Sequence, residues 1–118
     1  MSEQAIKKIL ITGANGFIGG SLMRYYQHQG QDVTGVDLVG NGDDIVEGDV
    51  SQPNTISQQL QECDVIIHTA ALVSNAMQDS DMWRVNVLAT RNLIQAAKEH
   101  KVRRFVQISS IVVYGNTA

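Results

Sequence analysis

Three glycines at every third position follow the first apolar segment of the sequence. The segment Thr12-Gly13-Ala14-Asn15-Gly16-Phe17-Ile18-Gly19 joins an apolar run at residues 9–11 to a stretch with helical spacing. The first glycine permits a tight turn, the second lets backbone N–H groups approach a pyrophosphate, and the third lets the helix pack closely on the strand. A glycine triplet alone is weak evidence, because glycines also end strands for structural reasons. The order of strand, triplet and helix nevertheless predicts a dinucleotide-binding loop whose helix faces the anion.

A single carboxylate, Asp37, ends the second apolar run at residues 33–36. At this position of a dinucleotide-binding unit, a carboxylate accepts hydrogen bonds from the adenine ribose hydroxyls and repels a 2′-phosphate. The next residues, Leu38-Val39-Gly40, include no Arg or Lys that would bind such a phosphate. The sequence therefore predicts NAD rather than NADP as the cofactor. The alternative is that Asp37 is a turn residue without a ligand.

The apolar segments that must position this loop recur at strand length, at residues 9–11, 33–36, 45–46, 65–67 and 105–108. Continuous aliphatic runs that alternate with helices indicate a parallel sheet that is buried on both faces and built from right-handed crossovers. The sequence therefore predicts an α/β fold with a Rossmann-like, doubly wound parallel sheet of about five strands. A chain of 118 residues is long enough for one domain.

Three segments between these strands have helical spacing. The first ends at Gly30, which suits the residue after a helix, and the second follows Pro53, which suits an early helical position. The third runs from about Asp79 to about Glu99 and has a basic last turn. The apolar side chains expected on the buried faces are Ile18, Leu22, Tyr25 and Tyr26 in the first, Ile56 and Leu60 in the second, and Met82, Val85, Leu93, Ile94 and Ala97 in the third.

Charge and composition exclude several classes of protein. Nine Lys and Arg against twelve Asp and Glu give a net charge of −3, which argues against nucleic acid as a partner. The basic residues within 98–104 are interpreted as cations at a helix end and in a solvated turn. No apolar run approaches the roughly eighteen residues of a membrane span, and residues 1–8 are polar rather than signal-like. Cys63 is the one cysteine, so we expect a reducing compartment, the cytoplasm, and no metal site.

The glycine loop resembles the T-G-x-x-G-F-I-G signature of the extended short-chain dehydrogenases/reductases. That family includes the NAD-dependent sugar-nucleotide epimerases and dehydratases, and the resemblance spans nearly the whole chain. It implies that the loop binds the cofactor together with Asp37. The loop residues so implied are Gly13, Asn15, Gly16, Phe17, Ile18 and Gly19.

The segment Gly48-Asp49-Val50 resembles the G-D-hydrophobic element that follows the third strand in this family. The resemblance implies that Asp49 and Val50 border the adenine of the cofactor. The alternative is that Asp49 caps a turn into the helix that follows Pro53.

The segment His68-Thr69-Ala70-Ala71 is similar to the H-x-A-A element of the family, which implies that Ala70 and Ala71 contact the cofactor. We interpret His68 as a hydrogen-bonded structural residue, without a role in acid–base chemistry or metal binding. Asn86 lies in a segment that resembles a helix of the family. We interpret it as structural, with a cofactor contact as the alternative.

Residues 108–115 resemble the S-S-x-x-V-Y-G block of the family. The resemblance implies that Ser110 is the catalytic serine, whose hydroxyl bonds the substrate oxygen during hydride transfer, and that Ser109 contacts the cofactor. The alternative is that Ser110 caps a strand end. The Tyr-x-x-x-Lys pair expected of the family, a general acid/base and its partner, is absent from the 118 residues, because no tyrosine has a lysine four positions on.

We therefore expect residues 1–118 to be an incomplete NAD(P)-binding domain that lacks the last strands and the C-terminal substrate-binding part. Surfaces that later elements would cover predict self-association. The leading hypothesis is the NAD-binding portion of an epimerase/dehydratase-type oxidoreductase that is inactive alone. A sugar nucleotide is the expected substrate, ahead of hydroxysteroid or flavonoid-type alcohols. The alternatives are a non-catalytic dinucleotide-binding or interaction module, and a folded remnant that binds nothing.

Overall fold

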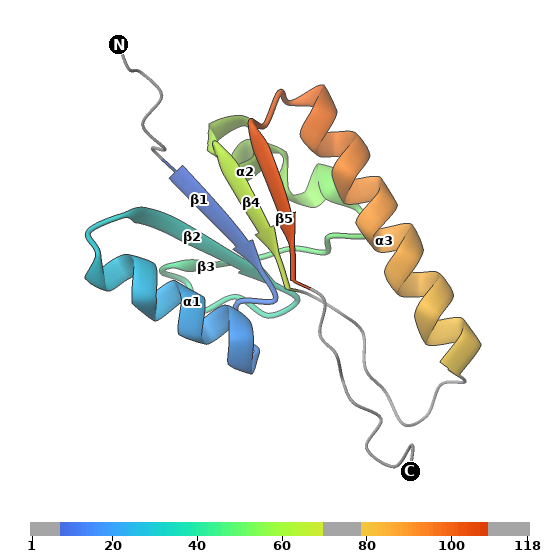
Figure 1. The fold of residues 1–118 in the computed structure, drawn as a ribbon, viewed down its shortest axis with the longest axis horizontal. Coiled ribbons are helices and arrows are strands. Elements are labelled where there is room, and N and C mark those ends of the chain that lie inside the picture. Colours follow the sequence, from blue (N-terminus) through green and yellow to red (C-terminus); the bar gives the residue numbers. More distant parts are fainter. Residues whose placement is uncertain (1–7, 70–78, 109–118) are drawn as a thin grey trace.

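Strands and helices alternate along the chain in the computed structural model, which describes residues 8–69 and 79–108 (Figure 1). The elements are β1 (Lys8–Thr12), α1 (Phe17–His28), β2 (Asp32–Asp37), β3 (Ile45–Glu47), the 3-10 helix η1 (Pro53–Ile56), α2 (Ser57–Glu62), β4 (Val65–His68), α3 (Asp79–Glu99) and β5 (Arg104–Gln107). Every predicted strand and helix is present within a few residues of its expected bounds. The α/β class predicted from the sequence is therefore confirmed.

The five strands form one parallel sheet in the order β3-β2-β1-β4-β5. The central strand β1 pairs with β2 on one side and with β4 on the other. In this register Thr12 lies beside Val36 on one side and His68 on the other. The carboxyl ends of the strands therefore meet at one edge of the sheet, where ligands bind in doubly wound folds.

Helices cover both faces of the sheet, with α1 on one face and α2 and α3 on the other (Figure 1). Successive side chains of a strand point to opposite faces, so Ile9 and Ile11 pack toward α1 whereas Leu10 packs toward α2 and α3. The core against α1 contains Ile9, Ile11, Ala14, Met23, Val33, Val65 and Ile67. The core against the other helices contains Leu10, Val36, Ile56, Leu60, Cys63, Ile66, Leu93, Ala96 and Ala97.

The predicted buried face of α1 was wrong at two positions. Ile18 is 40% exposed and Tyr25 is 57% exposed, whereas Gly19 and Met23 are the buried residues of this helix. Gly19 has no side chain, so the helix packs closely against the backbone of Gly13 there. Met23, one turn later, lies in the core, and the predicted residues Leu22 and Tyr26 pack against the core while partly buried.

The predicted face of α3 was wrong at Ile94, which is exposed. The buried residues are Leu93, Ala96 and Ala97, which share one stripe at spacings of three and four. Two alanines in this stripe allow the helix to lie close to the sheet. The side chains of Met82 and Val85 lie outside the described residues.

The prediction that all strands are buried on both faces was wrong for the two outer strands. β3 and β5 carry half-buried and exposed residues, whereas all four residues of β4 are buried. An outer strand has a neighbour on one side alone, so its residues pack less fully. The position of β5 at a sheet edge is confirmed for the described part of the chain. In that part, no helix combines the length and apolar character that a membrane span requires.

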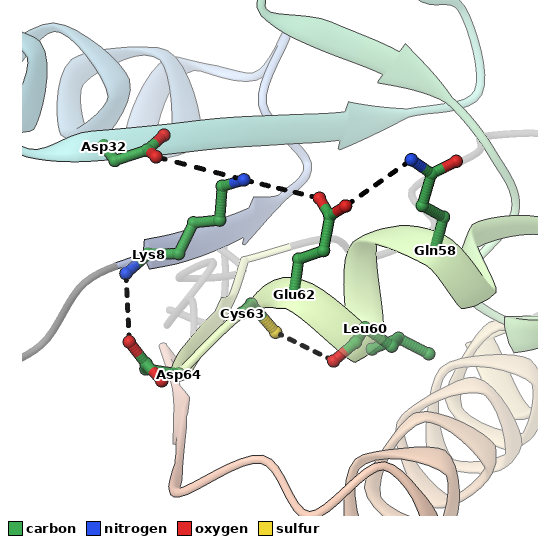
Figure 2. Close-up of polar contacts among 7 residues, drawn as sticks. All are labelled: Lys8, Asp32, Gln58, Leu60, Glu62, Cys63 and Asp64. Carbon is green, nitrogen blue, oxygen red and sulfur yellow. Dashed lines mark hydrogen bonds and ion pairs between the residues drawn. The ribbon is translucent and has the colours of Figure 1, made fainter.

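Charged side chains gather at the opposite, amino edge of the sheet (Figure 2). The Lys8 ammonium lies 3.3 Å from Glu62 Oε1 and 3.9 Å from Asp32 Oδ2. The backbone N–H of Lys8 donates to Asp64 Oδ2 at 3.1 Å. These contacts connect β1, β2, α2 and the residue that precedes β4. We call Lys8, Asp32, Glu62 and Asp64 the amino-edge cluster.

The free cysteine, Cys63, lies next to this cluster but faces the core and is 8% exposed. Its thiol contacts the carbonyl oxygen of Leu60 at 3.6 Å. Burial raises the pKa of the Cys63 thiol to about 11, so the thiol stays protonated at neutral pH. In the folded chain this cysteine therefore acts as a small apolar core residue.

Candidate functional site

The glycine loop forms a tight turn between β1 and α1. Gly13 has a φ of +68°, and the N–H of Gly16 donates to the Gly13 carbonyl at 2.9 Å. A Cβ on Gly19 would overlap the Gly13 carbonyl oxygen and lie 3.0 Å from Thr69 Oγ1. The turn expected at Gly13 and the close packing expected at Gly19 are therefore confirmed.

The amino end of α1 begins at the middle glycine of the loop. Gly16 is the N-cap residue, no side chain among the described residues caps the helix, and the first turn carries no acidic residue. The first amides of a helix have no partner within the helix, and with the positive end of the helix dipole they favour a bound anion at such a position. The glycines of the turn and the start of the helix at Gly16 fit the pyrophosphate of a dinucleotide.

Asp37 lies beside the glycine loop and is oriented by backbone N–H groups. Its Oδ2 accepts from the Asn15 N–H at 2.9 Å, and its Oδ1 accepts from the Leu38 N–H at 2.8 Å. The Asn15 side chain in turn donates to the Val39 carbonyl at 2.8 Å. An ionised carboxylate has about four acceptor positions, so each oxygen retains one for a ribose hydroxyl.

Asp49 forms the turn that leads from β3 into η1, as the alternative to an adenine contact predicts. Its Oδ1 accepts from the Ser51 N–H at 3.0 Å and from the Ser51 hydroxyl at 2.7 Å. The Asp49 N–H donates to Thr55 Oγ1 at 3.0 Å. Val50 is half-buried and packs against the core on the α2 side. Contacts of Asp49 and Val50 with adenine stay a prediction.

His68 is 2% exposed and lies between two threonine hydroxyls. Its Nδ1 is 2.7 Å from Thr12 Oγ1, and its Nε2 is 3.1 Å from Thr90 Oγ1 on α3. The ring also packs at 5.9 Å from that of Phe105 on β5. Burial lowers the pKa of His68 to about 4, so the imidazole is neutral at physiological pH. The interpretation of His68 as a hydrogen-bonded residue is confirmed, and the structure adds that the residue is buried.

The structure also reveals polar residues that the sequence patterns did not single out. The Thr69 N–H donates to Thr12 Oγ1 at 3.0 Å, and the Thr69 hydroxyl donates to the Thr12 carbonyl at 2.6 Å. Thr90, on α3, contacts the same histidine from the other side of the ring. A threonine at the end of a strand is a weak signal by itself. Its position beside a buried histidine became apparent from the tertiary structure.

Four predicted site residues, Ala70, Ala71, Ser109 and Ser110, lie outside the described residues. The described chain brings their neighbours together, because the N–H of Ile108 donates to the His68 carbonyl at 3.0 Å. The segments that lead to them therefore leave adjacent strands at the carboxyl edge.

Asn86 is half-buried on α3, and its contact with a cofactor stays a prediction. The described residues contain no group of three or more His, Cys, Asp or Glu side chains that could hold a metal ion.

Comparison with known proteins gives matches over nearly the whole chain. The model of the NAD dependent epimerase/dehydratase family matches residues 9–118. A putative dihydroflavonol 4-reductase of Synechocystis sp. is 32% identical over 114 residues, which are 89% of this chain and 33% of that protein. The chain spans about a third of the length of the curated relatives it matches.

Many solved structures have a similar fold, and two of them illustrate the similarity. A short-chain dehydrogenase/reductase superfamily protein from Agrobacterium tumefaciens, with bound NAD, is 36% identical with a TM-score of 0.76, over 87% of this chain and 32% of that one. The UDP-N-acetylglucosamine 4-epimerase from Bacillus cereus is 25% identical with a TM-score of 0.75, over 92% of this chain and 41% of that one. The predicted resemblance to the extended short-chain dehydrogenases/reductases is therefore confirmed.

Proposed function

Because this chain belongs to the NAD dependent epimerase/dehydratase family, we propose that it is the NAD-binding portion of an oxidoreductase that acts by hydride transfer. The observation that carries the proposal is the hydrogen bond between the Asn15 N–H and the Asp37 carboxylate. This bond joins the loop suited to a pyrophosphate and the acceptor suited to a ribose. The two groups lie at the edge of the sheet where dinucleotides bind in such folds.

The residues of this chain would hold the two polar parts of NAD separately. The amides of the glycine loop and the amino end of α1 would bind the pyrophosphate, while Asp37 would accept from the ribose hydroxyls. A carboxylate at this position repels a 2′-phosphate, which favours NAD over NADP. Bound NAD supplies the hydride acceptor, and the protein supplies orientation.

A sugar nucleotide is the proposed substrate class. The similarity to a UDP-N-acetylglucosamine 4-epimerase supports this class. Ser110 is the proposed hydrogen-bond donor to the substrate oxygen, and Ser109, Ala70 and Ala71 are proposed cofactor contacts. Ser110→Ala in an active enzyme that contains this segment should lower kcat more than it changes the Kd for NAD. An unchanged kcat would contradict the role.

The cofactor assignment is tested by calorimetry with NAD and NADP. We expect the wild type to bind NAD more tightly than NADP, and Asp37→Ala to weaken NAD binding by roughly tenfold to a hundredfold through loss of charged hydrogen bonds. Asp43→Ala is the matched control, because Asp43 is an exposed aspartate in the loop before β3. Equal NAD affinity of the wild type and Asp37→Ala would contradict the assignment.

A non-catalytic dinucleotide-binding or interaction module is the second candidate, because it would use the same glycine loop and Asp37. We propose that this chain binds NAD without turnover, because it lacks the general acid/base expected of the family. The test follows NADH absorbance after NAD and a sugar nucleotide are mixed with the chain. NADH production above the buffer rate would contradict the proposal.

Self-association is proposed from exposed apolar side chains on α3 and β5. Val87, Leu88 and Val106 are between 36% and 45% exposed. Sedimentation over a range of concentrations tests this proposal, and a monomer at every concentration would contradict it.

The cytoplasm is the proposed compartment, because Cys63 is a free, buried thiol. Fractionation of cells that express a tagged chain tests the compartment.

A further inference from the structure

A continuous series of hydrogen bonds connects α3 to the glycine loop through the interior of the sheet. It begins at Thr90 Oγ1 on α3, passes through the His68 ring on β4 and reaches Thr12 Oγ1 at the end of β1. The Thr12 hydroxyl oxygen accepts the Thr69 N–H, and the Thr69 hydroxyl donates back to the Thr12 carbonyl. We call Thr90, His68, Thr12 and Thr69 the hydroxyl–imidazole chain.

The hydroxyl–imidazole chain ends in direct contact with the glycine loop. Thr69 Oγ1 lies 3.5 Å from the Gly13 carbonyl oxygen, and it is among the three atoms that a Cβ on Gly19 would meet first. Thr12 immediately precedes Gly13. The position of the Thr69 hydroxyl therefore limits where the turn at Gly13 and the start of α1 can lie.

The burial of Thr12 and His68 makes the geometry of their hydrogen bonds specific. Thr12 is 0% exposed and His68 is 2% exposed. A buried polar group without its hydrogen bond loses its solvation with no compensation, so each group holds its neighbour in one orientation. His68 contributes two ring nitrogens on opposite sides. Thr90 itself is half-buried, and a displacement of its hydroxyl would reach Thr12 through the buried His68 ring.

We propose that His68 and Thr90 are positioning residues for NAD, which act on the cofactor through Thr12, Thr69 and the glycine loop. Neither residue needs to touch the cofactor in this role. The proposal rests on the NAD binding proposed above and extends it to a helix that packs on the opposite face of the sheet from α1. It identifies a connection between that helix and the amides that would bind the pyrophosphate.

The test compares Thr90→Val with Thr90→Ser. Valine has nearly the shape of threonine but no hydroxyl, whereas serine restores the hydroxyl. We expect Thr90→Val to weaken the binding of NAD and of ADP by about fivefold to tenfold, the effect of one lost hydrogen bond, and Thr90→Ser to recover most of the loss. Calorimetry well below the unfolding temperature gives the affinities, and thermal unfolding gives stability separately.

A second readout reports the geometry directly. In ¹⁵N NMR spectra, Thr90→Val should shift the imidazole nitrogens of His68 and the backbone amides of Gly13, Gly16 and Gly19. If Thr90→Val is too unstable for calorimetry, Thr90→Ala with the same spectra replaces it. A variant that is less stable but binds NAD as the wild type does would overturn the positioning role alone. A wild type that binds no NAD would overturn both this role and the proposed function.

Discussion

The two edges of the sheet both collect polar side chains, but they use them differently. At the amino edge, the Lys8 ammonium is paired with the carboxylates of Asp32 and Glu62, and these side chains are partly exposed. At the carboxyl edge, the Asp37 carboxylate accepts from the backbone and lies beside an uncapped helix. The amino edge pairs opposite charges with each other, whereas the carboxyl edge leaves donors and acceptors available to a ligand.

The difference has an energetic counterpart. Ion pairs between exposed side chains typically contribute less than about 1 kcal/mol each. Loss of a hydrogen bond between buried groups lowers the free energy of unfolding by more, because the partner that remains is left without solvent or a bond. His68 and Thr12 are buried and share such a hydrogen bond. Mutations at the carboxyl edge should therefore have larger effects than mutations at the amino edge.

The largest effect is expected from Gly19→Ala. The new Cβ would overlap the backbone of Gly13, so the loop or the start of α1 must move. We expect a loss of about 3 kcal/mol in the free energy of unfolding, as for a severe overpacking mutation, together with weaker NAD binding. Urea unfolding and calorimetry measure the two effects.

Gly20→Ala is the matched control for this mutation. A Cβ at Gly20 would meet its nearest atom at 3.4 Å, which is ordinary contact, and alanine favours a helix more than glycine does. We expect stability to be unchanged or raised by up to about 1 kcal/mol. Equal destabilisation by the two mutations would contradict the special role of Gly19.

A smaller effect is expected from pH at His68. Burial lowers the pKa of the folded-state imidazole from 6.5 to about 4, so the unfolded chain binds an extra proton between these values. Stability from this group is therefore complete above about pH 6.5 and decreases as the pH falls toward 4. We expect a loss of about 2 kcal/mol between about pH 7 and about pH 5. Urea unfolding at both pH values measures it.

His68→Asn should flatten this part of the pH dependence, and His28→Asn, at an exposed residue of α1, is the matched control for removal of an imidazole. Carboxylates titrate in the same range, so the difference between each variant and the wild type is the informative quantity. If His68→Asn does not fold, NMR titration of the wild-type ring gives the pKa directly. A folded-state pKa near 6.5 would contradict the prediction.

The smallest effect is expected from Lys8→Met at the amino edge. The two ion pairs of the Lys8 side chain would be lost, but the backbone bond to Asp64 would remain. We expect a loss below about 1 kcal/mol that decreases further at high salt. Lys98→Met, in the last turn of α3, is the control for removal of a positive charge. A loss as large as that of Gly19→Ala would remove the contrast between the two edges.

Sequence patterns predicted the local geometry of the site better than its tertiary contacts. The turn at Gly13, the packing at Gly19 and the position of Asp37 follow from neighbouring residues and from the end of a strand. The orientation of a helix about its own axis depends on what it packs against. The assignment of Ile94 to the core therefore failed, whereas Ala96 proved to be buried.

The same limit explains why Thr90 was missed. It follows His68 by 22 positions, and its contact with the ring requires α3 to cross the end of β4. No spacing rule connects a threonine inside a long helix with a histidine on a strand. The turn at Asp49 could be predicted as an alternative from the sequence, because its partner Ser51 is only two residues away.

The position of β1 in the middle of the sheet has a consequence for the order of folding. β1 comes before the other four strands in the chain, and its register pairs Ile9 with Val33 on one side and with Val65 on the other. The second pairing closes a far longer loop, which slows folding relative to local contacts. A ribosome therefore releases the central strand well before its second neighbour. Until β4 emerges, one edge of β1 remains a surface that chaperones or other chains can bind.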